Sequence, residues 1–426
     1  MKLPRTLFLT LFLTHGVFSA PASGQPHLNG RSFRVERVRR GSNNLHGPTA
    51  LRRAYTKYGI VPTDLGIDLD DFEPIAMHTA AQQDFSEPEL DQTGAVSAAS
   101  VQNDAAFVSP VTVGGQRLIL NFDTGSSDFW VMNSRLPELE TAGRTIFNPS
   151  KSNTFQEIEG ATFNISYGDS SFAAGDVGYD TVDIGGATVK RQAIGLPTTV
   201  SPSFLQDTYS NGLVGLGFSK LNTVQPKKQK TFLDNIAASL DAPVLTASLI
   251  SDGVGEYEFG IIDHTKYVGD IANVSIDSSN GFWEFKTAGF AVGGGPLKEL
   301  DSVPTAIADT GTSLMLLAED VVDAYYEQVQ GAVFVSSASG YIYPCTAELP
   351  SLTMAVGEKH YATVPGEFIH FSEVGVNKTT GETVCYGGIQ SNQGARMQIF
   401  GDAFLKAFFA VFDLRGPSLG LASPTY

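Results

Sequence analysis

The chain has 426 residues, 42% hydrophobic and 17% charged, so it can bury a large core and should form two or three domain-sized units. Its net charge of −17 is uneven: residues 21–59 hold eight basic side chains and one acid, whereas residues 93–426 hold 18 basic and 35 acidic ones. The basic stretch could be interpreted as a nucleic-acid-binding arm, but the acidic body would repel phosphate, and we expect no nucleic-acid partner.

The first 20 residues are typical of a secretion signal. Lys2 and Arg5 precede an apolar run at positions 7–17, and small residues follow at Ser19 and Ala20, where a peptidase could cut. We therefore interpret residues 1–20 as a cleaved signal peptide of a secreted, extracellular protein. The apolar run is shorter than the about 20 residues that span a bilayer, and no later segment is long and apolar enough, so we expect no membrane partner.

Residues 21–92 form a polar region that we interpret as an activation pro-segment. Its basic part is opposite in charge to the body, so the two should attract each other, and protonation of the acidic partner should weaken that attraction. Residues 82–100 are rich in Gln, Ser, Ala and acids. We predict that they form an exposed linker in which maturation cuts fall.

The body from residue 93 onward is dominated by strand patterns. Short runs of alternating or β-branched residues, separated by Gly, Asp, Asn and Ser, predict strands at 111–115, 118–122, 161–167 and 181–186. Helical periodicity is confined to 231–240 and 318–330. The helices are therefore expected to be accessories to an all-β architecture.

An internal duplication divides this body into two related halves. The segment 118–127, Leu-Ile-Leu-Asn-Phe-Asp-Thr-Gly-Ser-Ser, recurs as 304–313, Pro-Thr-Ala-Ile-Ala-Asp-Thr-Gly-Thr-Ser. Downstream of each copy, an apolar pair is closed by glycine, at 213–215 and 399–401. We predict two lobes of similar plan, residues 93–270 and 271–426.

The repeated Asp-Thr-Gly predicts a pair of carboxylates, Asp123 and Asp309. A lone Asp-Thr-Gly usually marks a turn, but two copies on opposed lobes can bring both carboxylates to one place. Carboxylates about 3 Å apart cannot both ionise, so they share a proton. Such a pair can activate a water while it polarises or protonates a carbonyl oxygen, which is the chemistry of amide hydrolysis.

These motifs resemble those of the pepsin family of aspartic proteases, most closely its secreted fungal penicillopepsin and aspergillopepsin type. The resemblance runs from about Phe107 to Leu421, and it is carried by segments 122–127, 130–131, 165–169, 211–217, 308–313, 385–390 and 399–405. It implies an all-β, bilobal fold with pseudo-twofold lobes and a central cleft. It also implies hydrolysis of internal bonds in protein and peptide substrates, without metal or cofactor, by a monomer.

The resemblance and the chemistry together assign roles to the residues of the site. Asp309 is the expected general base and Asp123 the acid of a pair that titrates as a unit. Around them we expect supporting residues, namely Thr124, Gly125, Ser126, Trp130, Thr310, Gly311 and Thr312. Substrate-binding residues are expected at Tyr167, Gly168 and Asp169 of a hairpin flap, and at Phe204, Leu205 and Leu213 of an apolar pocket that prefers large hydrophobic side chains.

Some of these assignments have plain alternatives. Trp130 and Tyr167 could be ordinary core residues, and Asp169 could be a solvated turn acid instead of the group that lets a lysine be accepted beside the scissile bond. Position 170 is a serine where the nearest relatives usually have glycine. In the pro-segment, Lys57 and Tyr58 match the part that blocks the carboxylates in related zymogens; the alternative is a solvated basic helix.

Covalent features are consistent with a secretory route. Cys345 and Cys385 are the only cysteines, and in an oxidising compartment we expect them to pair; two free buried thiols are the alternative. Glycosylation sequons begin at Asn164, Asn273 and Asn377. Because a sequon within a strand is often unused, Asn377 is the favoured site.

Two other functions could use a similar chain. A binding protein of the same fold could have lost catalysis, and a glycosidase also uses two carboxylates. Both aspartates, both hydroxyl residues beside them and the flap tyrosine are present, however, and the twinned loops favour a protease.

Overall fold

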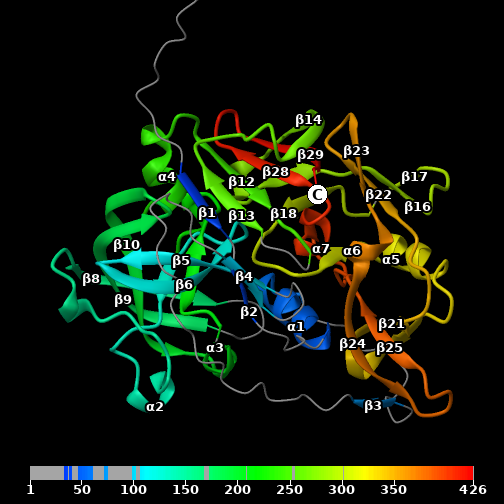
Figure 1. Ribbon diagram of the computed structural model, residues 1–426, viewed down its shortest axis with the longest axis horizontal. Helices are drawn as coiled ribbons and strands as arrows, with labels where there is room; N and C mark the ends of the chain where they lie inside the picture. Colours follow the sequence, from blue (N-terminus) through cyan, green and yellow to red (C-terminus); the bar gives the residue numbers. More distant parts are fainter. Residues whose placement is uncertain are drawn as a thin grey trace, which may run out of the picture.

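The structure is a computed structural model that describes residues 33–36, 38–40, 47–60, 72–74, 98–101, 106–166, 172–207, 209–251, 255–300 and 302–425. The predicted signal peptide, much of the pro-segment and the flap residues Tyr167, Gly168 and Asp169 lie outside these ranges. Within them, no helix is long and apolar enough to cross a membrane. Strands dominate and helices are short (Figure 1), which confirms the predicted all-β architecture.

The first half is built on a nine-stranded sheet. In spatial order its strands are β2 (Val38–Arg40), β4 (Ala98–Val101), β5 (Ala106–Val113), β6 (Gln116–Asp123), β11 (Gly212–Gly215), β7 (Phe129–Val131), β10 (Ala187–Val200), β9 (Phe172–Ile184) and β8 (Gln156–Ser166). Three short helices accompany it, α2 (Glu138–Thr141), α3 (Pro202–Gln206) and α4 (Phe232–Ile236).

The second half contains three smaller sheets. The first has the order β15 (Glu284–Lys286), β18 (Thr305–Ala308), β27 (Gln398–Phe400), β19 (Met315–Leu317) and β26 (Ile389–Ser391). The second has the order β20 (Val333–Val335), β21 (Gly340–Pro344), β25 (Thr383–Gly387), β24 (His370–Asn377) and β3 (Phe72–Pro74). The third has the order β17 (Lys298–Glu299), β16 (Gly289–Val292), β22 (Leu352–Val356) and β23 (His360–Val364), and the helices are α5 (Glu319–Tyr326), α6 (Gly366–Ile369) and α7 (Asp402–Leu405).

A six-stranded sheet joins the two halves. Its order is β1 (Phe33–Glu36), β13 (Glu256–Phe259), β12 (Val244–Ser248), β28 (Phe409–Asp413), β29 (Ser418–Pro424) and β14 (Tyr267–Ser275). Strand β12 comes from the first half and β28 from the second, and they pair antiparallel over five residues. The predicted boundary at residue 270 lies within β14, so the division of the lobes there stays a prediction.

The duplication seen in the sequence appears as two equivalent three-strand units. In the first half, β11 runs parallel to β6 and antiparallel to β7. In the second half, β27 runs parallel to β18 and antiparallel to β19. The apolar-apolar-glycine segments therefore lie beside the strands that lead into the two Asp-Thr-Gly loops.

The two predicted helices are present but shorter than expected. The 231–240 segment forms α4 followed by a 3-10 turn. Thr231 caps the start of α4 by accepting the Asp234 N–H. Helix α5 occupies the start of 318–330, and the predicted apolar face is buried at Val321, Val322, Tyr325, Tyr326 and Val329.

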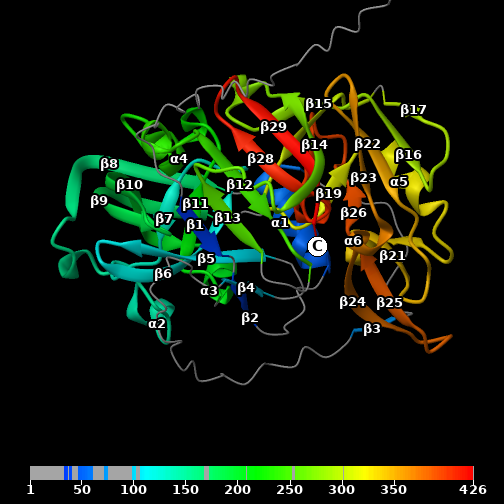
Figure 2. The ribbon, with the colours of Figure 1, turned by 45° about the horizontal axis from the view of Figure 1, so that its top comes forward.

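The pro-segment contributes to three of these sheets and adds one helix. Strand β1 pairs with β13, β2 with β4 and β5, and β3 with β24. Helix α1 (Gly47–Lys57) lies near the middle of the molecule, between the green and the yellow-to-orange halves, in both Figure 1 and Figure 2.

The prediction of a linker at 82–100 is wrong for residues 98–100. Residues 98–100 belong to β4, which pairs with β5 on one side and β2 on the other. Pairing with distant strands overrides the small, polar composition on which the prediction rested. The other residues of the linker, 82–97, lie outside the described ranges.

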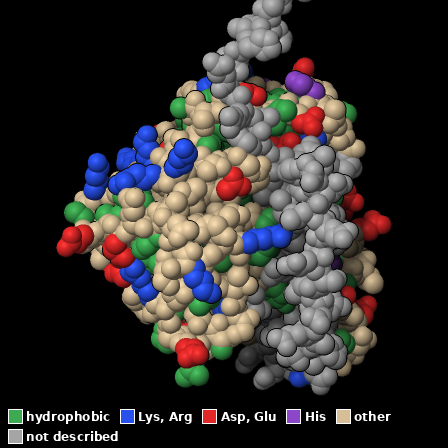
Figure 3. Space-filling model, turned by 60° about the vertical axis from the view of Figure 1, so that its left-hand side comes forward, with side chains coloured by type: hydrophobic (Ala, Val, Ile, Leu, Met, Phe, Trp, Pro, Cys, Tyr) green, Lys and Arg blue, Asp and Glu red, His purple; other side chains and the backbone are tan. Residues whose placement is uncertain are grey.

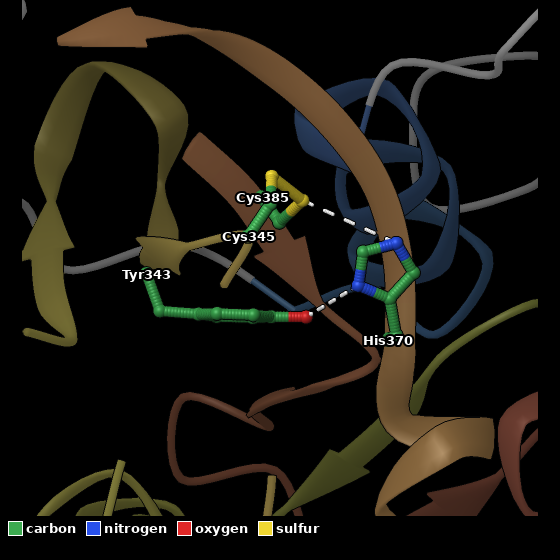
Figure 4. The surroundings of a disulfide bond; sticks show 4 residues. All are labelled: Tyr343, Cys345, His370 and Cys385. Carbon is green, nitrogen blue, oxygen red and sulfur yellow. Dashed lines mark hydrogen bonds between the residues drawn. A yellow bond between two sulfur atoms is a disulfide. The ribbon is translucent and has the colours of Figure 1, made fainter. Parts of the chain in front are cut away.

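The expected disulfide joins Cys345, which follows β21, to Cys385 in β25, with the Cα atoms 5.0 Å apart. His370 lies beside it at the start of β24 (Figure 4), with its Nε2 atom 4.0 Å from Cys385 Sγ. The Tyr343 hydroxyl lies 3.0 Å from His370 Nδ1, and burial lowers the pKa of His370. The bond therefore fastens two neighbouring strands of one sheet in the second half.

Candidate active site

Both aspartates lie at the ends of buried strands, held from the side by the matching glycine segments. Asp123 ends β6, and its carbonyl oxygen accepts the Leu216 N–H at 2.7 Å. Asp309 follows β18 directly, and its own N–H donates to the Phe400 carbonyl at 3.1 Å. Each carboxylate is thus fixed by a strand on its own lobe, and both side chains are fully buried.

Two threonines tie the loops to each other across the interface of the lobes. Thr124 N–H donates to Thr310 Oγ1 at 3.1 Å, and Thr310 N–H donates to Thr124 Oγ1 at 3.0 Å. Each hydroxyl also donates to a carbonyl of the opposite strand, at Ala308 and Phe122. Because both residues are buried, breaking this reciprocal set would leave polar groups unpaired in the core.

The two glycines bond the inner carboxylate oxygens and allow the loops to meet. Gly125 N–H donates to Asp123 Oδ1 and Gly311 N–H to Asp309 Oδ1, both at 2.9 Å. A Cβ added to Gly125 would lie 2.5 Å from Asp309 Oδ1, and one added to Gly311 would lie 2.4 Å from Asp123 Oδ1. Any other residue at either position would push the opposing carboxylate away.

The outer oxygens have different partners on the two sides. Ser126 Oγ donates to Asp123 Oδ2 at 2.6 Å, as the sequence suggested. The Thr312 side chain helps to lower the pKa of Asp309. Oδ2 of Asp309 accepts from Tyr58 at 2.5 Å and from Lys57 at 2.7 Å, so groups of the predicted pro-segment occupy this side.

Lys57 contacts both carboxylates at once. Its ammonium lies 2.7 Å from Asp123 Oδ1 and 2.7 Å from Asp309 Oδ2. The two carboxyl groups are therefore within reach of a single small polar group. Burial lowers the pKa of Lys57, but the two negative carboxylates outweigh burial and raise it, so the ammonium stays charged.

The two carboxyl groups respond differently to this neighbour. Burial raises the pKa of Asp123, and the nearby Asp309 carboxylate adds to that rise, while Lys57 opposes it. Burial acts the same way on Asp309, but the charge of Lys57 and the hydrogen bonds from Lys57 and Tyr58 outweigh it and lower the pKa. The two groups titrate as a coupled pair, so a proton taken up on acidification belongs to the pair as a whole.

Helix α1 delivers Lys57 by packing on the second lobe. Leu51 and Tyr55 are buried in one cluster with Ile307, Leu316 and Tyr386. Fully burying a side chain such as Leu51 contributes about 2 kcal/mol. The helix begins so close to Tyr386 that a Cβ on Gly47 would lie 2.1 Å from its ring.

An apolar cavity of about 110 Å³ adjoins the carboxylates, between α1 and the first lobe. Trp130 and Phe204 line it and pack edge to face, with ring centroids 4.9 Å apart. Leu213 lines it as well, and Leu205 packs in the same cluster without lining the cavity. The structure therefore brings together the pocket residues expected from the sequence. Further lining residues that the sequence did not single out include Asn121, Met132, Ser203, Asp207 and Ser210.

Arg144 braces the α3 segment that carries Phe204 and Leu205. Its guanidinium donates to the Leu205 carbonyl and, at 2.7 Å, to the Asp207 carbonyl. The side chain is half-buried, and burial lowers its pKa. Arg144 lies about 60 residues from the segment it holds, so no local motif points to it.

Asp128 is another buried carboxylate, five residues after Asp123. It is 2% exposed and accepts hydrogen bonds from the Asn222 amide and from the backbone and hydroxyl of Thr223. Burial raises its pKa to about 6, although the bonds from Thr223 oppose the rise. This group therefore changes charge within a few residues of the catalytic loop.

The predicted glycosylation positions differ in their surroundings. Asn164 and Asn273 are exposed side chains within β8 and β14. Asn377 ends β24, and its Oδ1 accepts the N–H groups of Thr379 and Thr380. The flap residues Tyr167, Gly168 and Asp169 and their expected contact with Trp130 lie outside the described residues.

The sequence is similar to those of known aspartic proteases. Residues 106–424 match the family model of the eukaryotic aspartyl proteases. The chain is 68% identical over 424 residues, 98% of each chain, to a protein of Aspergillus fumigatus named "Putative aspergillopepsin A-like aspartic endopeptidase". It is 50% identical to aspartic protease PEP3 of Coccidioides posadasii, over 92% of this chain and 89% of that one. With endothiapepsin of Cryphonectria parasitica it shares 41% identity over 98% of this chain and 99% of that one.

When Asp128 is replaced by Asn, the stability of the protein should fall less between acidic and neutral pH. The folded pKa of Asp128 is raised to about 6 from 3.8, so the folded state binds more protons between these values and its stability falls as pH rises. The full shift corresponds to about 3 kcal/mol. We expect the melting temperature of the Asp128→Asn precursor to fall less than that of the wild type between pH 4 and pH 7.

The control for this measurement is Asp270→Asn, which removes an exposed carboxylate in β14. It should follow the wild-type profile. If Asp128→Asn also follows that profile, burial of Asp128 does not destabilise the fold at neutral pH.

Proposed function

Because the chain belongs to the eukaryotic aspartyl protease family and is an aspartic endopeptidase, we propose that it is a secreted enzyme, made as an inactive precursor, that cuts internal peptide bonds at acidic pH. The single observation that carries the catalytic part is the position of the Lys57 ammonium, 2.7 Å from an oxygen of each aspartate. In the mature enzyme a water takes this position, where both carboxyl groups can bond it.

The proposed reaction needs one ionised and one protonated carboxyl group. Asp309 acts as general base on the water, while Asp123 donates a proton to the carbonyl oxygen of the scissile bond. Ser126 orients the Asp123 carboxyl by donating a hydrogen bond to its outer oxygen at 2.6 Å. The attacking oxygen comes from water, so no covalent intermediate with the enzyme forms. The pair still titrates as one unit.

The pro-segment blocks the site in two ways: it replaces the catalytic water, and it covers Asp309 and the cavity. Lys57 takes the place of the water, Tyr58 covers Asp309, and α1 lies against the apolar cavity. Acid reverses this, because a proton taken up by the coupled pair removes one of the two charges that hold Lys57. The segment then leaves, and the enzyme cuts its own precursor.

Substrate preference follows from the apolar cavity. Phe204, Leu213 and Trp130 offer a site for a large hydrophobic side chain beside the scissile bond, where buried area provides most of the selectivity. Acceptance of lysine at this place depends on Asp169 of the flap. Asp207 also lines the cavity, but its Oδ1 already accepts two backbone N–H groups.

Secretion is supported by the leader-like residues 1–20, by the Cys345–Cys385 disulfide and by the sequons at Asn164, Asn273 and Asn377. The mature enzyme acts as a monomer on extracellular proteins. Mass spectrometry of the secreted protein's N-terminus identifies the maturation site.

Asp309→Asn and Asp123→Asn should each lower kcat on a peptide substrate by at least about 10³-fold, because an amide can replace neither the base nor the acid of the pair. The measurement uses precursor processed in trans and then freed of the processing protease, assayed near pH 4 with and without a statine-type inhibitor. Asp183→Asn, which changes a partly exposed carboxylate of β9 far along the chain from either loop, is the control. Retained proteolysis in either catalytic variant would falsify the proposal.

Lys57→Met should shift activation of the precursor toward neutral pH. Removing one partner of a buried ion pair costs about 3 kcal/mol or more, so the clamp weakens by about 100-fold or more. The rate of N-terminal processing near pH 6, followed by mass spectrometry, checks this. Arg52→Met, on an exposed position of the same helix, should process as slowly as the wild type. Equal rates for all three precursors would show that Lys57 does not hold the site closed.

Arg144→Met should lower kcat/KM about tenfold for peptides with a large hydrophobic residue beside the scissile bond, because two carbonyls of the α3 segment lose a charged donor. Arg144→Lys should restore part of the activity, and Arg117→Met, an exposed arginine in β6, should have no effect. A loss that is equal for substrates with small and large side chains would instead indicate a general loss of folding.

A further inference from the structure

The first lobe carries an exposed group of six basic side chains, which we call the basic patch: Lys190, Arg191, Lys220, Lys227, Lys228 and Lys230. Figure 3 shows lysine and arginine side chains gathered on the upper part of this lobe, with acidic side chains around the gathering and none visible within it. The patch contrasts with the rest of the body, since residues 93–426 contain 35 acidic and only 18 basic residues.

Contacts between three chain segments hold the patch together. Lys228 Nζ donates to the Lys220 carbonyl at 2.5 Å, and Gln192 donates to the Lys230 carbonyl at 3.2 Å. Tyr179 links the remaining parts: its hydroxyl donates to Gln229, and the guanidinium of Arg191 lies 3.9 Å above its ring. The start of β10, the Lys220 turn and the 227–230 loop thus form one surface.

The charge of the patch is not neutralised by the described residues around it. None of its six cations forms an ion pair with a carboxylate within the part of the chain that the structure describes. Asp277 and the buried Asp128 interact electrostatically with Lys220 and Lys228, but neither forms an ion pair with them among the described residues. Most of the positive charge therefore remains available to a partner.

We propose that the basic patch binds an anionic polysaccharide that carries sulfate or phosphate esters. Five of the six cations are lysines, whose separate, mobile ammonium groups suit a flexible chain of spaced anions better than one bidentate ligand. The exposed large hydrophobic side chains of the described residues, Leu139, Ile261, Val268, Leu297, Val333 and Tyr361, all lie outside the patch. The patch thus lacks the apolar anchors with which a protein enters a lipid surface.

The proposed acidic working range selects the kind of anion, and this step rests on the proposed function. Aspartate and glutamate side chains of a protein partner lose charge near pH 4, whereas sulfate esters and the first ionisation of phosphate esters persist. The lysines keep their charge throughout, and the acidic body becomes less repulsive to a polyanion. Binding to such a polymer would hold the enzyme in a matrix while its cleft remains open, because no patch residue lines the cavity beside the carboxylates.

The test compares two mature enzymes of equal charge. The patch variant carries Lys227→Gln, Lys228→Gln and Lys230→Gln, and the control variant carries Lys286→Gln, Lys298→Gln and Lys359→Gln at exposed positions of the second lobe. With dextran sulfate as the probe near pH 5, we expect at least a tenfold weaker affinity for the patch variant and an unchanged affinity for the control. The dependence of log K on log salt should become shallower by roughly two to three for the patch variant, one for each lost contact.

Three other measurements decide the remaining outcomes. Cleavage of a short uncharged peptide should be equal in all three enzymes, which separates this proposal from the catalytic one. If the patch variant folds poorly, the double variant Lys190→Gln, Arg191→Gln is measured instead, and it must bind dextran sulfate more weakly than the wild type does. Equal weakening in patch and control variants, or tighter binding to single-stranded DNA or to phosphatidylserine vesicles than to dextran sulfate, overturns the proposal.

Discussion

The structure depends on the burial of two carboxylates at the place where two lobes meet. Neither Asp123 nor Asp309 is exposed, and two negative charges so close in a buried site require either a shared proton or a cation. The reciprocal threonine bonds and the paired glycines hold the two loops at this distance, so the electrostatic conflict cannot be relieved by moving the lobes apart. The Lys57 ammonium resolves the conflict in this structure, and a shared proton resolves it in the proposed active enzyme.

This constraint explains why the pro-segment is integrated so deeply into the fold. An ammonium between the carboxylates is stable only if its helix is held firmly, and α1 achieves this by burying Leu51 and Tyr55 against the second lobe. Strands β1, β2 and β3 attach the same segment to three different sheets. The proposed release therefore requires the loss of strand pairing and apolar contacts as well as of the ion pairs of Lys57.

The sequence alone was sufficient for those features that repeat or that lie next to each other along the chain. The twinned Asp-Thr-Gly loops, the glycine segments beside them and the predominance of strands can all be recognised locally, and Lys57 could be placed by resemblance. Arg144, the burial of Asp128 and the pairing of residues 98–101 with β2 could not be predicted, because each depends on contacts between segments far apart in sequence. Thr312 matches Ser126 in the repeat, but two groups that the repeat does not supply, Lys57 and Tyr58, also bond the outer oxygen of Asp309.

The buried acids of the first lobe give the two states of the chain different pH preferences. Asp128 disfavours the folded first lobe as pH rises above about 4 toward 6, because burial raises its pKa. Lys57 needs ionised partners, so protonation of the Asp123 and Asp309 pair weakens its contact with the site. Acid therefore relieves the burial of the Asp128 charge and loosens the Lys57 contact at the same time. Activation and the proposed acidic working range thus follow from the same property, the cost of charged carboxylates in a buried site.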